Sequence, residues 1–184
     1  MKQSIRQAAE VLKNGGVIIY STETLPGIGC LSSNVSAIKS IYEIKERDPK
    51  KAMLVLVNSI SMIKRFKSNL SELEQELLLS EEPTTVILNN VGGIPKELTA
   101  ENSSLAFRIT KHTTCLELIK AIDEPLVSTS INISGEPAAT NYNKISSNIK
   151  SKIDFIMLDE TENKLNKASR IVKVNGNKIN YIRK

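Results

Sequence analysis

The sequence predicts an α/β (α+β) fold, in which helices flank a twisted, mixed β-sheet. Short apolar runs of strand length are interspersed with amphipathic stretches of helix length, but the two kinds do not alternate strictly. Near its end the chain has two apolar runs that flank Asn175-Gly176, a pair typical of an antiparallel hairpin. A mixed sheet therefore fits better than a purely parallel, doubly wound sheet. We expect one domain over residues 1–184, because 40% of the residues are hydrophobic and no long linker or internal repeat divides the chain.

The first helix is predicted from its cap and its apolar face. Ser4 can cap it, and Gly15 and Gly16 end it. The face that we expect to be buried consists of Ile5, Ala8, Ala9 and Leu12. Further helices are predicted over residues 36–46, 59–66, 71–79, 113–122 and 141–150. The 71–79 helix has a capping box, formed by Ser71 and Glu74.

Strands are predicted from short apolar runs bounded by turn residues. These runs cover residues 17–20, 53–57, 85–88, 105–109, 126–129, 155–158, 170–174 and 178–182. Residues 21–29 follow the first strand, and we interpret them as a loop with a glycine-rich turn.

Composition excludes several kinds of site. His112 is the only histidine, so a histidine-based metal site or a Cys/His nucleophile pair is hard to build. Cys30 and Cys115 are the only cysteines, and we expect both to be reduced core residues. No apolar run approaches the ~20 residues of a membrane span, and the first residues lack the apolar block of a signal peptide. We therefore expect a cytoplasmic protein without a cleaved leader and without membrane contact.

The chain is basic, with a net charge of +5 and a pI of about 9.1. This balance suits an anionic partner such as a nucleotide or RNA, although a solvated basic surface has the same composition. Aromatic residues make up only 4% and tryptophan is absent, which argues against stacking platforms for single-stranded nucleic acid.

Three polar segments could carry chemistry. The chain has no P-loop motif, and Ser32 stands where Gly27 and Gly29 would need a third glycine for a dinucleotide fingerprint. The first segment, residues 21–29, offers hydroxyls at the end of a strand and could bind a small polar ligand or simply form a capped loop. The second, residues 45–51, holds four cations.

In the second segment, Arg47 can grip phosphate oxygens bidentately and Lys51 can act as a point charge. The alternative is a solvated charge run. The third segment, residues 128–135, begins inside an apolar strand, so its small hydroxyls and its amide either face a ligand or form an ordinary turn. Arg108 ends another apolar strand, where it either pairs with an acid or binds an anion.

Taken in order, these segments resemble the YrdC/TsaC family of threonylcarbamoyl-AMP synthases in its short form, and the resemblance covers nearly the whole chain. The matching elements are Thr22-Glu23-Thr24, Lys45-Glu46-Arg47, Arg108, Ser130-Ile131-Asn132-Ile133-Ser134-Gly135, Ser169 and Arg183. The chain departs from the family pattern at Ser21, at Asp48 before Pro49, over residues 81–85, and at Leu56, where many members have histidine.

The resemblance implies a YrdC-like domain with a large, positively charged concave face. It implies synthesis of threonylcarbamoyl-AMP and pyrophosphate from ATP, L-threonine and bicarbonate, with Mg²⁺ accompanying ATP and no organic cofactor. The product would serve the modification of adenosine 37 in tRNAs that read ANN codons, through a downstream threonylcarbamoyl-transferase complex. Weak binding of tRNA or other RNA is compatible with the charge.

The resemblance also implies roles for individual residues. The catalytic set would be Lys45, Arg47, Ser130 and Asn132. The ATP-binding set would be Arg47, Lys51, Ser104, Ser130, Asn132, Ala138 and Arg183. The threonine-binding set would be Thr22, Thr24, Leu56, Arg108, Ser128 and Ser169. No side chain is assigned to a resident metal.

Two alternatives remain open at this stage. The chain could be an RNA-binding module without catalysis that grips duplex RNA through its phosphates. It could also resemble the carbamoyl-transfer domain of hydrogenase maturation factors, which shares the fold, but those chains are much longer.

Overall fold

The computed structural model describes residues 2–157 and 167–184. Its centre is a nine-stranded sheet with the order β7-β1-β2-β6-β3-β5-β4-β8-β9. The strands are β1 Ile18–Tyr20, β2 Gly27–Gly29, β3 Leu54–Val57, β4 Thr84–Leu88, β5 Leu105–Ile109, β6 Leu126–Ser130, β7 Phe155–Met157, β8 Arg170–Asn175 and β9 Lys178–Arg183. Three pairs are parallel (β1–β7, β3–β5 and β4–β8) and the other five are antiparallel. The predicted mixed sheet is therefore confirmed.

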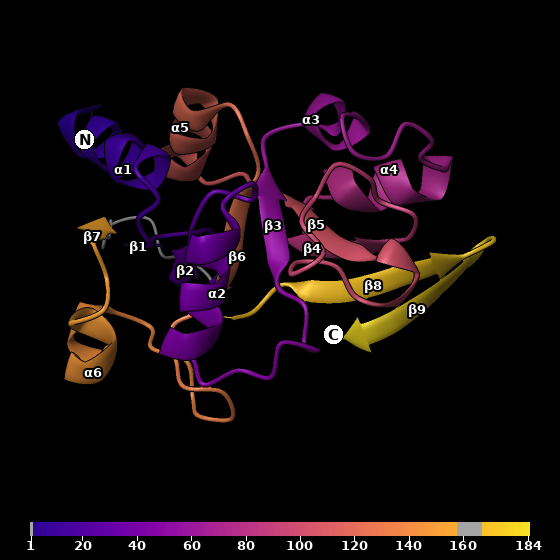
Figure 1. Cartoon of the computed structure of the whole chain (residues 1–184). Helices are drawn as coiled ribbons and strands as arrows, with labels where there is room; N and C mark the ends of the chain where they lie inside the picture. The colour runs from indigo at the N-terminus through magenta and orange to yellow at the C-terminus, as the bar shows by residue number, and fades with distance from the viewer. Residues whose placement is uncertain (1, 158–166) are drawn as a thin grey trace.

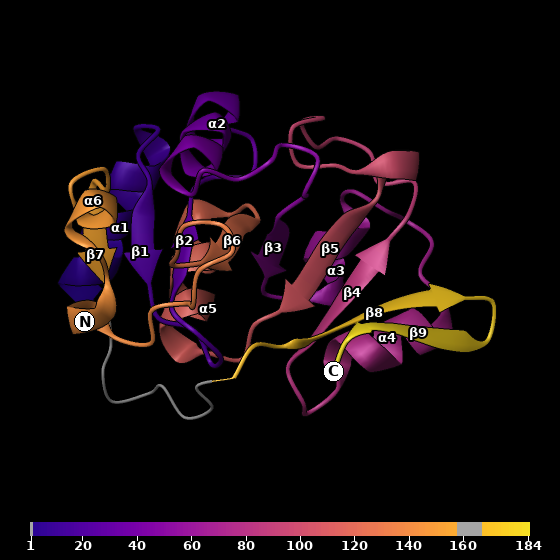
Figure 2. The ribbon, with the colours of Figure 1, turned by 90° about the horizontal axis from the view of Figure 1, so that it is seen from below.

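Helices lie along both sides of this sheet (Figure 1). They are α1 Lys2–Lys13, α2 Val35–Ile44, α3 Ile60–Lys64, α4 Glu72–Leu79, α5 Thr113–Ile122 and α6 Ser147–Lys150, with 3-10 turns η1 Glu101–Ser103 and η2 Tyr142–Lys144. In Figure 1, α1, α5, α3 and α4 lie above the strands, whereas α2 and α6 lie lower. The hairpin of β8 and β9 extends away from α1, as the view from below also shows (Figure 2).

Most helix predictions are confirmed, but two differ in an instructive way. The helix α1 buries the expected face but begins at Lys2, so Ser4 lies inside it and is not its cap. The predicted helix over residues 141–150 is split into η2 and α6. Asn141 and Ser146 each cap one piece, and the buried Ile145 between them has an extended backbone. The extended backbone at Ile145 and Ser146 therefore interrupts the predicted helix.

Residues 27–29 form the strand β2, so their interpretation as part of a loop was wrong. The strand lies between β1 and β6, and at Gly29 a side chain has no room. A Cβ atom on Gly29 would lie 2.1 Å from the carbonyl oxygen of Val127 and 2.8 Å from Cε1 of Tyr20. Glycine here permits close approach of a neighbouring backbone, a use that turn statistics do not reveal.

The C-terminal hairpin is confirmed with a shift of one residue. Asn175 pairs with Lys178, so the turn residues are Gly176 and Asn177. Gly176 has φ 58°, which explains why the turn needs a glycine at this position.

The core is continuous across the described part of the chain. Residues from α1, α2, α5 and the central strands bury their apolar side chains in one cluster. Cys30 and Cys115 are buried within it as thiols, as predicted. Among the residues that the structure describes, no helix combines the length and apolarity needed to cross a membrane.

Gly29→Ala is expected to destabilise the fold by about 3 kcal/mol or more, because the new methyl group collides with backbone that cannot move freely. Gly92→Ala is the matched control, since the nearest atom to its Cβ is 4.0 Å away, and a change within about 0.5 kcal/mol is expected. Urea unfolding of both variants measures the difference. Equal stabilities would show that β2 can separate from β6 at little cost.

Candidate functional site

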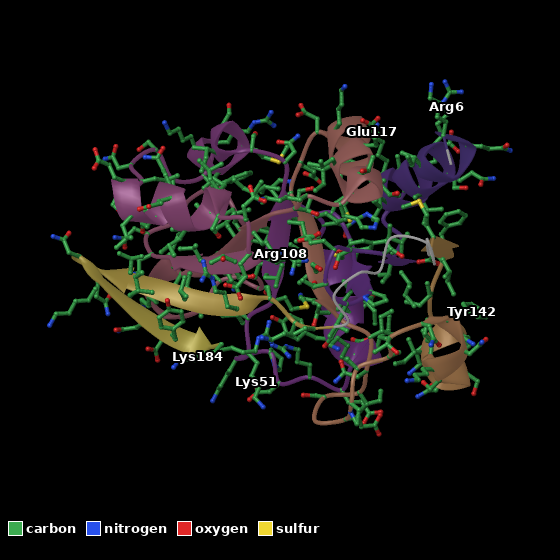
Figure 3. The ribbon with its side chains drawn as sticks, turned by 180° about the vertical axis from the view of Figure 1, so that it is seen from behind. Arg6, Lys51, Arg108, Glu117, Tyr142 and Lys184 are labelled. Atoms are coloured by element: carbon green, nitrogen blue, oxygen red, sulfur yellow. The ribbon has the colours of Figure 1, made fainter. Side chains whose placement is uncertain are left out.

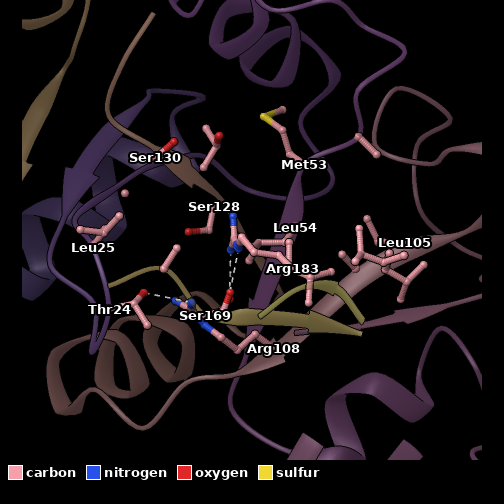
Figure 4. Close-up of a pocket in the computed structure, with 18 of the residues that line it drawn as sticks. Thr24, Leu25, Met53, Leu54, Leu105, Arg108, Ser128, Ser130, Ser169 and Arg183 are labelled. Atoms are coloured by element: carbon pink, nitrogen blue, oxygen red, sulfur yellow. Dashed lines mark hydrogen bonds between the residues drawn. The ribbon is translucent and has the colours of Figure 1, made fainter. Parts of the chain in front are cut away.

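The structure contains a cavity of about 310 Å³ whose walls come from segments far apart in the sequence. Eight residues of the predicted sites line it: Thr24, Arg47, Ser104, Arg108, Ser128, Ser130, Ser169 and Arg183. Figure 4 shows side chains from β5, β6 and the C-terminal hairpin turned toward the same hollow. The cations and hydroxyls that the motifs supply therefore meet in one place.

Arg108 is buried in the middle of the molecule, whereas Arg6 and Glu117 lie at its surface (Figure 3). The Arg108 side chain is 4% exposed, and its Nε lies 3.1 Å from Oε1 of Glu23, with which it forms an ion pair. Its Nη1 donates to Oγ1 of Thr24 at 3.0 Å, the contact dashed in Figure 4. The guanidinium is thus held on two sides by the segment that follows β1, while it lines the cavity.

Glu23 belongs to one of the matched motifs, but the sequence assigned it no role in the site. Its other oxygen, Oε2, accepts a hydrogen bond from Oγ1 of Thr110 at 2.7 Å, so the carboxylate is fixed between β5 and the loop after β1. A buried arginine needs a counter-charge, and this general rule was the available signal. The sequence offered many acids as partners, however, and did not show which of them lies beside Arg108.

Thr22 lies beneath the cavity and not in its wall. Its hydroxyl donates to the carbonyl of Leu25 at 2.8 Å and lies 3.0 Å from Oγ1 of Thr24. The backbone N–H of Thr24 donates back to Oγ1 of Thr22 at 3.1 Å. Thr22 therefore shapes the loop that presents Thr24 to the cavity.

Arg183 enters the cavity from β9. Its Nε donates to the carbonyl of Ser169 at 2.9 Å and its Nη2 to the Ser169 hydroxyl at 3.4 Å. The same hydroxyl is 2.9 Å from Oγ1 of Thr85. Burial lowers the pKa of Arg183, and the positive charge of Arg108 makes a smaller contribution in the same direction. Two arginines that disfavour each other's charge would be stabilised by an anion between them.

Arg47 lies in the loop after α2 and also lines the cavity. Its Nε donates to the carbonyl of Lys51 at 2.8 Å and its Nη2 to that of Ala52 at 3.0 Å. These bonds use two of the five N–H groups of the guanidinium and fold the loop back on itself. Lys51 itself is exposed and does not line the cavity.

Lys45 and Asn132 contact each other behind the cavity wall. The Lys45 ammonium donates to the carbonyl oxygens of Ser130 and Asn132 and to Oδ1 of Asn132, the latter two at 2.8 and 3.0 Å. Oδ1 of Asn132 also accepts from the Ser130 hydroxyl at 2.6 Å. Burial lowers the pKa of Lys45 to about 8, and the nearby positive charge of Arg47 makes a smaller contribution in the same direction.

Two further predicted residues, Leu56 and Ala138, also lie outside the cavity wall. Leu56 is fully buried in β3, opposite Arg108 in the sheet register, so it packs beside the arginine. Ala138 is half-buried in the segment after the 130–134 turn. Conversely, an apolar part of the wall was not predicted, because its residues read as core: Met53, Leu54, Leu105, Ala106, Ile171 and Ile182.

Within residues 2–157 and 167–184, no group of three or more His, Cys, Asp or Glu side chains could hold a metal ion. The cavity instead offers arginines, hydroxyls and an apolar wall. This set of groups suits an anionic ligand that also has an apolar part.

The chain is similar to known proteins in sequence and in fold. Residues 10–184 match the model of the Sua5/YciO/YrdC family, which is described as "Telomere recombination". A threonylcarbamoyl-AMP synthase of Klebsiella pneumoniae subsp. pneumoniae is 34% identical over 139 residues, covering 73% of this chain and 73% of that protein. The P. abyssi Sua5 structure complexed with L-threonine has a TM-score of 0.90 at 25% identity, covering 100% of this chain and 54% of that one. This chain thus spans about half the length of that Sua5.

A full-length HypF structure in a phosphate- and nucleotide-bound form has a TM-score of 0.86 at 22% identity, and the match covers 98% of this chain and 28% of HypF. At that identity the likeness shows the fold alone. The family model, in contrast, spans most of the chain and includes every residue that lines the cavity. The chain belongs to the Sua5/YciO/YrdC family.

Proposed function

We propose that the chain is an enzyme, a threonylcarbamoyl-AMP synthase, and that the cavity is its active site. One observation carries the proposal: Arg47, Ser130 and Arg183, from three distant segments, line the same cavity as Arg108. The relative with 34% identity bears that name, and the Sua5 structure was solved with L-threonine. A nucleotidyl transfer to a carboxylate-like oxygen is the chemistry that such a set of cations and hydroxyls can support.

In the proposed reaction, the amine of threonine takes up carbon dioxide derived from bicarbonate, and a carbamate forms. A carbamate oxygen attacks the α-phosphorus of ATP, and the bond to the bridging oxygen breaks to release pyrophosphate. Arg47 and Arg183 neutralise the phosphate charge, and Ser104 and Ser130 bind polar atoms of the nucleotide. Arg108 binds the threonine carboxylate, with Thr24, Ser128 and Ser169 around the amino acid. The site works by positioning and charge neutralisation.

Three further assignments are part of the proposal. Mg²⁺ arrives with ATP, whose phosphate oxygens are the ligands that this cation prefers. Lys51 and the backbone of Ala138 contact the nucleotide only beyond the cavity wall, since neither lines it. A mixed anhydride of a carbamate is an activated donor, so a transferase would consume the product, and the family resemblance implies adenosine 37 of tRNA as the acceptor.

The test is to incubate the purified protein with ATP·Mg²⁺, labelled L-threonine and bicarbonate. We expect pyrophosphate and labelled threonylcarbamoyl-AMP in equal amounts, and neither product when threonine or bicarbonate is omitted. Mass spectrometry identifies the adenylate, and a coupled assay measures pyrophosphate. Nucleotide binding without pyrophosphate release would overturn the proposal. Tight, salt-sensitive binding of duplex RNA together with no turnover would favour the RNA-binding alternative.

A further inference from the structure

Lys45 is a charged residue inside the protein, with 1% of its surface exposed. It ends α2, and its side chain points toward the turn formed by residues 130–134, which follows β6. An ammonium group has three N–H donors and no acceptor. All three are matched by oxygens of that turn, namely the two carbonyls and the side-chain oxygen described above. A phosphate could be contacted only if one of these bonds were broken.

The backbone of Lys45 joins the same turn. Its carbonyl accepts a hydrogen bond from the N–H of Ser134 at 2.8 Å. Asn132 in turn donates from Nδ2 to the carbonyls of Ile133 and Glu136, at 3.0 and 2.8 Å. One residue thus makes four hydrogen bonds to the turn, and the amide of Asn132 carries that order further along the chain.

The two ends of this contact lead directly to the cavity. Ser130 lines it at the start of the turn, and Arg47 lines it two residues after Lys45. The Lys45 ammonium itself lies behind the wall and does not line the cavity. Its place in the structure is therefore between the two segments that present groups to the ligand.

We propose that Lys45 is a positioning residue that does not contact the substrate: it holds the 130–134 turn against the end of α2, so that Ser130 and Arg47 face one cavity at a fixed spacing. Asn132 acts with it by receiving the ammonium on two of its oxygens. The identity of the ligand rests on the proposed function, but the contact between the two segments does not.

The first test uses hydrogen exchange of the ligand-free protein. In Lys45→Met, a side chain of similar length without donors, the amide of Ser134 is expected to exchange at least tenfold faster, while amides of β4 and β5 keep their rates. Lys50→Met is the matched control, since Lys50 is exposed in the adjoining loop, and it should change neither. Unchanged exchange at residues 130–136 in Lys45→Met would overturn the proposal. This result does not depend on turnover, so it is distinct from a failure of the proposed function.

The second test measures affinity for ATP by calorimetry. Lys45→Met and Asn132→Ala are each expected to lower the affinity for ATP at least tenfold. The double variant should bind ATP no more weakly than the single variant with the lower affinity, because both changes release the same turn. Additive losses would show that the two residues act separately and would count against a shared positioning role. If Lys45→Met does not fold, Asn132→Ala alone must show the faster exchange at Ser134.

The pH dependence supplies a readout that simple loss of stability would not move. With its pKa near 8, Lys45 loses a proton above that pH, and the neutral amine has two donors for three oxygens. The groups of the turn around Nζ are uncharged carbonyls and an amide, and Arg47 is the charged neighbour from its own segment. The ATP affinity of the unmodified protein should therefore fall as the pH rises through about 8. The profile of Lys45→Met should be flat across the same range, and a matching decline in that variant would overturn the assignment.

Discussion

Arg47→Ala is expected to lower kcat/KM for ATP by about 1,000-fold, or about 4 kcal/mol, because the cavity loses the guanidinium that, in the proposed reaction, neutralises phosphate charge as pyrophosphate leaves. The free energy of unfolding should change by no more than about 1 kcal/mol, since Arg47 is partly exposed and its bonds to the carbonyls of Lys51 and Ala52 order only the local loop. Initial rates of pyrophosphate release at varied ATP, together with urea unfolding, measure both quantities.

Two further variants make this result specific. Arg47→Lys keeps the charge but not the planar fork, and it should recover only a small part of the lost rate, since an ammonium cannot hold two phosphate oxygens in parallel. Lys50→Ala removes an exposed cation from the same loop and should leave kcat/KM within about twofold. Full activity of Arg47→Ala would remove this arginine from the reaction, even though its position in the cavity wall would remain.

Local signals in the sequence predicted most of the fold. The helix over residues 113–122 and the strand over residues 105–109 have the predicted bounds, and the capping box of Ser71 and Glu74 is present. These features depend on spacing within one segment, which the sequence displays directly. The strand at Gly27–Gly29 could not be predicted in the same way. Glycine is required there because the backbone of β6 and the ring of Tyr20 lie too close for a side chain on Gly29.

The site, like the fold, was predicted where local motifs were sufficient and not where contacts between distant segments decide. Short motifs located Arg47, Ser130 and Arg183, and the fold brings them to one cavity. The motifs did not separate residues that face a ligand from residues that hold those in place. Lys45 and Asn132 belong to the same motifs, yet their polar atoms bond to each other and to backbone. Only three-dimensional contacts distinguish the two roles.

Glu23 makes the same point about electrostatics. The sequence indicated that Arg108 either pairs with an acid or binds an anion, and the structure shows that it does the first while remaining in the cavity wall. The carboxylate of Glu23 approaches Nε, which leaves the other side of the guanidinium to Thr24 and to a ligand. A buried pair of this kind keeps the arginine oriented before any substrate arrives.

This pairing decides how the role of Arg108 must be tested. Arg108→Ala is expected to raise the KM for L-threonine about 100-fold, because the cation that we propose binds the threonine carboxylate is lost, while the KM for ATP should change by no more than about threefold. The same substitution leaves the Glu23 carboxylate, which is 16% exposed, without its ion-pair partner. An unpaired charge of this kind costs about 3 kcal/mol or more of stability. A fall in activity alone would therefore be ambiguous.

The double variant Glu23→Gln/Arg108→Gln separates the two effects, because it removes both charges and keeps side chains that can hydrogen-bond to Thr24 and Thr110. Its unfolding free energy should return to within about 1 kcal/mol of the unmodified protein, whereas the KM for L-threonine should remain raised about 100-fold. Steady-state rates at varied threonine and urea unfolding of the same preparations give both values. Recovery of threonine affinity along with stability would mean that Arg108 only balances Glu23, and the carboxylate of the amino acid would then have to be bound by another group of the cavity, such as Arg183 or Arg47.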